Sequence, residues 1–235
     1  MATSTQNELK RQAAEAAVDL IKPGMVVGLG YGSTALHAIR KIAALMAEGR
    51  LWDIVGVPCS VWTEGEAHRL GIPLINLDLC TAIDLTIDGA DEVDPELNLI
   101  KGAGGALLRE KMVAQATKRQ VIVVDESKLS PRLGTHFDLP VEVVPFGSGA
   151  SARFITGLGA QVRLRRDTTG APVLTDQGNY LLDCTFGPIS NLSALAAALE
   201  SRAGIVEHGL FLGLATDVLV AGTTGLSHLH RKAQA

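Results

Sequence analysis

The chain has 235 residues, of which 47% are hydrophobic and 20% are charged, a balance typical of a folded globular protein rather than a disordered one. Its formal net charge of −4, with scattered lysines and arginines, gives no electrostatic footprint for nucleic acid. No segment approaches the ~18 consecutive apolar residues of a membrane span, and the N-terminal stretch lacks a signal peptide's apolar core, so we expect a cytoplasmic protein with no membrane and no nucleic-acid partner.

Strand and helix signals alternate in the first part of the chain. An amphipathic helix is expected from Asn7 to Leu20, because the Lys-Pro-Gly sequence at 22–24 stops it. Further strands are expected at 25–30, 54–58, 73–77, 83–88 and 121–124, and further helices at 33–49, 63–70 and 105–118. This alternation predicts an α/β fold with a mostly parallel, Rossmann-like sheet and helices on both faces, in which ligands bind where strands end and helices begin.

The pattern changes after about residue 134. Strands are expected at 141–145, 161–166, 180–184 and 204–210, and helices at 151–159 and 191–202. Their order, βαββαβ, is typical of a ferredoxin-like α+β domain. We therefore expect residues 135–209 to form a smaller domain and residues 1–134 and 210–235 to form the larger one, with a last strand inside 216–225.

Cysteine and histidine usage does not indicate a metal site. The three cysteines, Cys59, Cys80 and Cys184, are widely spaced and are expected as small core residues. The histidines show no ligand spacing and are isolated apart from a pair near the C-terminus: His37, His68, His136, His208, His228 and His230. We expect no metal and no cofactor.

The stretch "GLGYGST" (28–34) follows an expected strand and opens an expected helix. Its glycines would let backbone amides approach an anion closely, and the start of a helix favours negative charge. The dinucleotide fingerprint is not present, because Ser33 stands where its last glycine would be. The turn is either a cradle for a phosphate or sugar oxygen, or only a tight connection between strand and helix.

Two carboxylates follow the strand expected at 83–88. Apolar and polar residues alternate along this strand, so Asp88 emerges at its carboxyl end, and the turn "GAD" holds Asp91 close by. Such a pair could relay a proton or orient sugar hydroxyls. The alternative is a polar turn in which Asp91 serves as a cap. The next three acidic residues, Glu92, Asp94 and Glu96, are expected to be solvated loop charges.

Lys101, Glu110 and Lys128 are further candidates. Lys101 precedes the small-residue turn "GAGGA" and could neutralise an oxyanion or a phosphate. Glu110 lies on an apolar arc of the following helix, and burial there would disfavour its charged form, which suits a proton-transferring base. Asp125 and Lys128, in "VVDESK", place another carboxylate and lysine at a strand end, and the alternative is a solvated loop.

The four motifs "GLGYGST", "DGADE", "KGAGGALLREK" and "VVDESK" closely resemble, in this order and at these separations, the type A family of ribose-5-phosphate isomerase. The resemblance extends over nearly the whole chain, including "LPVEVVP" at 139–145. It implies an enzyme of the pentose phosphate pathway, without metal or organic cofactor, that interconverts ribose 5-phosphate and ribulose 5-phosphate. It also implies a homodimer or a homotetramer.

The family's residues carry over onto matching positions of this chain. Glu110 takes the place of the base, Asp88 and Asp91 would assist ring opening and proton shuttling, and Lys101 would stabilise the oxyanion. The implied substrate contacts are Tyr31, Gly32, Ser33, Thr34, Asp88, Gly89, Ala90, Asp91, Lys101, Gly102, Ala103, Gly104 and Lys128.

Two positions depart from the family pattern, and two other functions remain open. Tyr31 stands where Thr or Ser is usual, and Ala103 stands where glycine is common. A non-catalytic sugar-phosphate sensor could share this architecture, although Glu110 and the lack of a DNA-binding segment argue against it. A coenzyme A transferase-like enzyme or an amino-sugar phosphate deaminase would not be expected to combine both the DGAD and KGxGG motifs.

Overall fold

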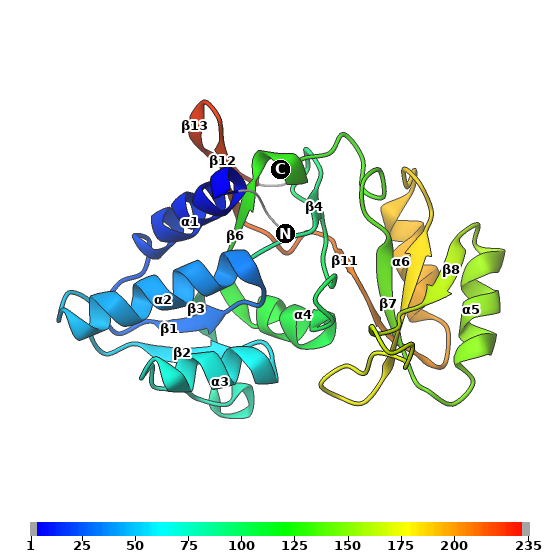
Figure 1. The fold of residues 1–235 in the computed structure, drawn as a ribbon, viewed down its shortest axis with the longest axis horizontal. Helices are drawn as coiled ribbons and strands as arrows, with labels where there is room; N and C mark the ends of the chain where they lie inside the picture. The colour runs from blue at the N-terminus through cyan, green and yellow to red at the C-terminus, as the bar shows by residue number, and fades with distance from the viewer. Residues whose placement is uncertain (1–3, 232–235) are drawn as a thin grey trace. The chain divides into compact units, whose positions relative to one another are not determined.

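The computed structural model of the chain describes residues 4–231 (Figure 1). Within that range the chain forms two compact units. Unit 1 comprises the described parts of Met1–Ala90, Arg109–Leu129 and Gly213–Ala235, and unit 2 comprises Asp91–Leu108 and Ser130–Leu212. Among the described residues, no helix is both long and apolar enough to cross a membrane.

Unit 1 is built on a six-stranded sheet with the order β13-β12-β6-β3-β1-β2. All neighbouring strands pair in parallel except β13, which returns antiparallel to β12. The strands are β1 (Val26–Leu29), β2 (Val55–Pro58), β3 (Ile83–Asp88), β6 (Thr117–Asp125), β12 (Asp217–Gly222) and β13 (Gly225–His230). The mostly parallel arrangement confirms the predicted α/β class.

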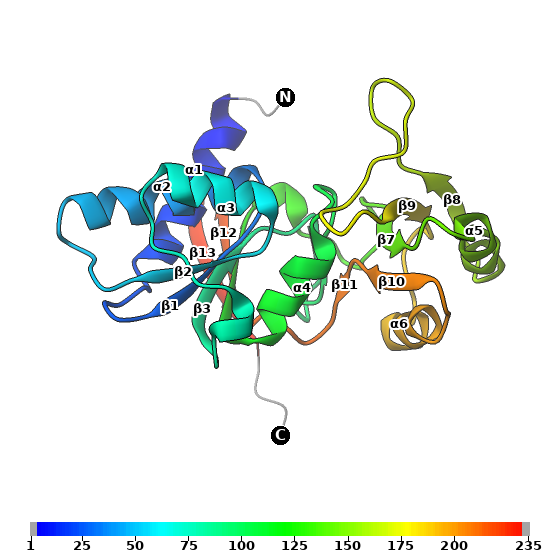
Figure 2. The ribbon, with the colours of Figure 1, turned by 90° about the horizontal axis from the view of Figure 1, so that it is seen from below.

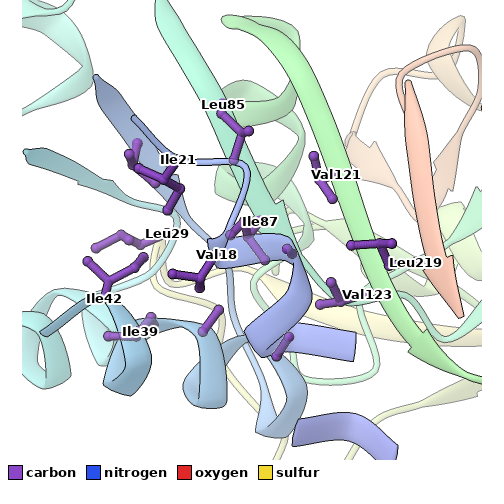
Figure 3. Close-up of a cluster of buried hydrophobic side chains, with 14 of the residues drawn as sticks. Val18, Ile21, Leu29, Ile39, Ile42, Leu85, Ile87, Val121, Val123 and Leu219 are labelled. Carbon is purple, nitrogen blue, oxygen red and sulfur yellow. The ribbon is translucent and has the colours of Figure 1, made fainter. Parts of the chain in front are cut away.

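The helices of unit 1 are α1 (Ser4–Val18), α2 (Ser33–Ala47), α3 (Val61–Arg69) and α4 (Leu107–Gln115), whose first two residues fall in unit 2. Unit 1 also contains the short 3-10 turns η1 (Leu77–Leu79) and η2 (Glu126–Lys128). Figures 1 and 2 show α1 and α2 on one side of the sheet and α4 on the other. Figure 3 shows the main core, where Val18 and Ile42 of these helices meet Leu85, Ile87 and Leu219 of the sheet. Burial of this apolar surface stabilises the layer under α1 and α2.

Unit 2 contains a four-stranded antiparallel sheet with the order β10-β7-β9-β8. Its elements are β7 (Leu139–Val143), α5 (Ser148–Gly157), β8 (Gln161–Leu164), β9 (Tyr180–Thr185), α6 (Leu192–Glu200) and β10 (Ile205–His208). Their chain order is the predicted βαββαβ, and the first strand lies between the fourth and the third, so the ferredoxin-like prediction is confirmed.

A second sheet in unit 2 lies in segments that the sequence analysis assigned to the larger domain. Its strands are very short, β4 (Glu92–Val93), β5 (Leu99–Ile100) and β11 (Leu210–Phe211), in the order β11-β5-β4. Ile100, Leu133 and Leu210 join the apolar core of unit 2. The segment 91–108 therefore packs with unit 2, whereas the predicted boundary placed it with residues 1–134.

Three local expectations differ from the structure. The strand expected at 73–77 is reduced to one bridge between Gly56 and Leu74. The helix expected to reach residue 118 ends at Gln115, because β6 begins at Thr117. Strand β13 was not expected, and all six of its residues are exposed, so it lacks the apolar alternation that marks a half-buried strand.

Two of the expected loop charges are buried. Glu92 is 0% exposed, and its carboxylate accepts N–H groups from Gly134 at 2.8 Å and from Thr135 and His136 at 3.1 Å. Asp94 is 8% exposed and accepts the amide of Asn98 at 2.8 Å. The expectation of solvated charges was wrong for both, because backbone donors take the place of water.

We predict that Glu92→Gln lowers the free energy of unfolding by about 1–3 kcal/mol, because a neutral amide is a weaker acceptor for three backbone donors and adds an NH₂ group among them. Urea denaturation followed by circular dichroism measures the change. Glu96→Gln is the matched control, since Glu96 is exposed, and we expect its effect to stay within about 0.5 kcal/mol. Equal midpoints for the two variants would show that Glu92 contributes no more than a surface residue.

Candidate active site

The turn from β1 to α2 passes unusually close to β3. A Cβ on Gly28 would lie 1.9 Å from Thr86 Oγ1, and a Cβ on Gly30 would lie 2.3 Å from Asp88 Oδ1. Gly32 has φ +103, which side chains with a Cβ rarely adopt. The glycines of this motif are therefore required by close backbone approach and by one left-handed position.

Asp88 ties this turn to the end of β3. It is 1% exposed, and its Oδ1 accepts the amide of Tyr31 at 3.1 Å and that of Gly89 at 2.8 Å. The expected position at the carboxyl end of a parallel strand is thus observed. A carboxylate held by two backbone donors is fixed in orientation, as a residue that handles substrate hydroxyls must be.

Glu110 and Cys59 lie beside Asp88 in unit 1. Glu110 is 4% exposed on α4, and its helical neighbours Leu107 and Val113 are 0% and 2% exposed, so the apolar arc inferred from the sequence is buried. The Cys59 sulfur and one carboxylate oxygen each of Asp88 and Glu110 lie within 4.8 Å of one another. This cluster can transfer protons between carboxyl groups, and its donors are also ones that could hold a metal ion.

The start of α2 offers a place for an anion. Gly32 caps the helix without a side-chain hydrogen bond, and Ser33 and Thr34 form the first turn. Lys10 Nζ, from α1, donates to Ser33 Oγ at 3.3 Å. A helix start and a lysine together favour a phosphate group. The sequence analysis missed Lys10, because nothing in the sequence of an amphipathic helix distinguishes one of its lysines as a ligand contact.

The Tyr31 ring packs against α3 rather than standing alone. Its centroid is 5.4 Å from that of Trp62, with an interplanar angle of 85°, an edge-to-face contact. The ring also packs on the small cluster that contains Val57 and Cys59. The side chain therefore contributes apolar packing, while the Tyr31 backbone amide holds Asp88.

Lys128 occupies the end of η2, after β6. Asp125 caps this turn by accepting the amide of Ser127 at 3.1 Å, and it is 2% exposed. Lys128 is partly buried. The solvated-loop explanation is therefore wrong for Asp125, which has a structural role in presenting Lys128.

In unit 2, Asp91 organises the second small-residue turn. Its Oδ2 accepts the amide of Ala103 at 2.8 Å, and its own amide donates to Ile100 O at 2.9 Å. Gly102 has φ +109, and a Cβ there would lie 2.8 Å from Leu107 Cδ2. Ala103 is exposed, so its methyl group needs no space inside the protein. Asp91 is thus a turn cap, as the alternative in the sequence analysis proposed. Its Oδ1 atom is a second hydrogen-bond acceptor.

Lys101 is 2% exposed, although lysines are among the residues least often buried. Its Nζ lies 5.6 Å from the centre of the Phe211 ring. A cation over an aromatic face and removed from water exerts a strong local field. This placement suits a group that stabilises negative charge.

Arg165 supports the same turn and was missed by the sequence analysis. Its Nη1 donates to the carbonyl oxygens of Gly102 at 3.1 Å and Ala103 at 2.9 Å, and its Nε donates to Asp183 at 3.1 Å. With two carbonyls held by Arg165, the peptide groups of the turn are fixed in direction. Three arginines, at 163, 165 and 166, occur in this segment, so sequence alone does not show which of them reaches the turn.

We predict that Gly30→Ala lowers the free energy of unfolding by about 1–3 kcal/mol, because the new Cβ would lie 2.3 Å from Asp88 Oδ1 and 2.5 Å from Ile87 O. Thermal and urea unfolding provide the measurement. Gly65→Ala, inside α3 with no atom within 4 Å of the added Cβ, is the control and should be neutral or stabilising. A Gly30→Ala variant as stable as the parent would contradict the close approach of the two strands.

Comparisons with known proteins agree with this geometry. Residues 55–225 match the family model of Ribose 5-phosphate isomerase A (phosphoriboisomerase A). The chain is 59% identical over 229 residues to ribose-5-phosphate isomerase A of Chloroflexus aurantiacus, covering 97% of this chain and 96% of that protein. It is 57% identical over 226 residues to the protein of the same name from Desulfatibacillum aliphaticivorans, covering 96% and 98%.

Solved structures give the same result. A D-ribose-5-phosphate isomerase in complex with phospho-erythronic acid matches with a TM-score of 0.93 and 37% identity over 95% of this chain and 98% of that one. Ribose 5-phosphate isomerase from Plasmodium falciparum also has a TM-score of 0.93 and 37% identity, covering 96% and 99%. The chain therefore belongs to the ribose 5-phosphate isomerase A family, which confirms the resemblance carried by its four motifs.

Proposed function

We propose that this protein interconverts D-ribose 5-phosphate and D-ribulose 5-phosphate, as an aldose-ketose isomerase of the non-oxidative pentose phosphate pathway, and that Glu110 carries the proton. Family membership supports the reaction. The observation that supports the residue assignment is the buried cluster in unit 1, where a carboxylate oxygen of Glu110 lies within 4.8 Å of one of Asp88.

The reaction requires a base that moves a proton between C1 and C2 through an enediolate. Glu110 is 4% exposed on the apolar side of α4, so its carboxyl group is largely withdrawn from water and held on a rigid element. Asp88 is fixed by two backbone amides and would guide the sugar oxygens during ring opening. Asp91 accepts the amide of Ala103. We assign it, together with Asp88, to proton transfer between O1 and O2 of the sugar.

The enediolate intermediate carries negative charge that needs a fixed partner. Lys101 is assigned this role because it is 2% exposed, and the adjacent backbone amides of Gly102 and Gly104 are assigned as further donors. One solved relative is in complex with phospho-erythronic acid. The carboxylate of that compound resembles a planar, negatively charged enediolate, and we expect it to bind this protein more tightly than the substrate does.

The phosphate group is assigned to the start of α2. The turn from Tyr31 to Thr34 provides backbone amides and hydroxyls, and Lys10 adds a positive charge 3.3 Å from Ser33 Oγ. Lys128 is assigned to the substrate as well. Neutralising a phosphate dianion with two lysines and a helix start is a common arrangement for sugar phosphates.

We further propose a cytoplasmic homodimer or homotetramer with no nucleic-acid partner. The formal net charge of −4 supports the last point. Sedimentation of the full chain measures the assembly, and a monomer at micromolar concentration would contradict it.

We predict that Glu110→Gln keeps the fold and lowers kcat for ribose 5-phosphate by about 10²- to 10⁴-fold, because the amide cannot accept the proton. Glu64→Gln, an exposed position on α3, is the matched control and should retain parental kcat. Release of deuterium from C2-labelled substrate provides the second readout. Near-parental turnover by folded Glu110→Gln would remove Glu110 from the role of base, and a parent without turnover would favour the sugar-phosphate sensor.

We predict that exhaustive chelation and dialysis leave turnover unchanged, because proton transfer and charge stabilisation are assigned to the protein's own side chains. The measurement is kcat/KM before and after treatment. The cluster of Cys59, Asp88 and Glu110 could hold an ion, which makes the experiment informative. Loss of activity that Mg²⁺, Mn²⁺ or Zn²⁺ restores would show that turnover depends on a bound metal ion.

A further inference from the structure

The β12–β13 hairpin brings together three metal-binding side chains that the proposed reaction does not use. In the register of the two strands, Asp217 lies directly opposite His230, and Leu219 lies opposite His228. Residues two apart on a strand point to the same face, so both imidazoles lie on the face that carries Asp217. The sequence analysis noted the histidine pair but had no means of placing Asp217 beside it.

The donor atoms of these three residues converge. Asp217 Oδ1 lies 2.7 Å from His228 Nε2 and 2.9 Å from His230 Nδ1. The two imidazole rings are 4.0 Å apart between centroids and tilted by 37°, so their nitrogens face the same oxygen. Among the described residues, the three donor atoms form one of two groups close enough to hold an ion.

We propose that Asp217, His228 and His230 form a binding site for one divalent transition-metal ion of the Zn²⁺, Ni²⁺ or Cu²⁺ type. Two imidazoles and one carboxylate suit these ions, whereas Mg²⁺ and Ca²⁺ prefer sets made of oxygen donors. Metal–ligand bonds of about 2.0–2.1 Å place neighbouring donors roughly 3 Å apart, so the present positions need only small adjustments. Water completes the coordination, since the His228 and His230 side chains are 31% and 62% exposed.

The surroundings of Asp217 prepare it as a ligand. Arg119 donates to both oxygens, at 2.8 Å and 3.0 Å, and Thr216 Oγ1 donates at 2.7 Å. Each carboxylate oxygen has two lone pairs, so Oδ1 can bind Arg119 and an ion together. Arg119 and Thr216 fix the orientation of the carboxylate, as residues that hydrogen-bond to metal ligands commonly do.

Asp217 and Asp88 point to opposite faces of the sheet in unit 1. Asp217 shares its face with Leu219, which belongs to the core under α1 and α2. Asp88 follows Ile87 of that same core, so its side chain points to the opposite face. Metal binding at the hairpin should therefore leave turnover of ribose 5-phosphate unchanged.

Isothermal titration of the full chain, made without a histidine tag and stripped of metal, tests the proposal with Zn²⁺, Ni²⁺ and Cu²⁺ as separate probes. We expect one ion per chain, tightest binding for Cu²⁺, and no comparable binding of Mg²⁺. His228→Ala and His230→Ala should each weaken binding at least tenfold. His68→Ala, at an exposed helical histidine, is the matched control and should bind as the parent does. Circular dichroism and turnover of the double variant His228→Ala/His230→Ala should equal those of the parent.

The unfolding temperature provides a second, independent measurement of metal binding. An ion that binds only the folded chain raises the unfolding temperature, so Zn²⁺ should stabilise the parent and His68→Ala but not the double variant. Absence of saturable binding would overturn the proposal. Binding that survives in the double variant would also overturn it, because the ion would then occupy other ligands.

Discussion

The close approach of β1 to β3 at their carboxyl ends is the constraint on which the candidate active site depends. Parallel strands lie about 4.8 Å apart, and here Thr86 and Asp88 fill the space that side chains at Gly28 and Gly30 would need. The turn into α2 therefore passes over Asp88 with its amides exposed to that carboxylate. One steric condition thus fixes both the acid at the end of β3 and the helix start assigned to phosphate.

Charged groups are buried both in the candidate active site and in a turn that has only a structural role. Glu92 is fully buried, but three backbone amides surround its carboxylate and leave it chemically occupied. Glu110 and Lys101 are also buried, Glu110 on an apolar helix face and Lys101 over an aromatic ring, and withdrawing either charged group from water has an energetic cost. Burial alone therefore does not distinguish the candidate base Glu110 from a structural carboxylate such as Glu92.

The sequence allowed the architecture and part of the site to be predicted, because both rest on short-range periodicity. Strand β3 has its predicted bounds, and the alternation along it and the arc on α4 indicated Asp88 and Glu110. Lys10 and Arg165 escaped prediction, because each has a long side chain that reaches a turn distant in the sequence. Strands β4 and β5 have two residues each, too few to show the alternation of apolar and polar residues by which a strand is predicted.

The chain order of unit 1 has a consequence for synthesis of the protein. Strand β6 pairs with β12 along one edge, yet the whole of Ser130–Leu212 is made between them. Until β12 emerges from the ribosome, the apolar run Val121–Val124, which is 0–2% exposed in the finished sheet, borders an open edge. Unpaired apolar edges recruit strands from other chains. Strand β12 therefore covers an apolar edge of the sheet, and we expect a chain that ends before Asp217 to aggregate.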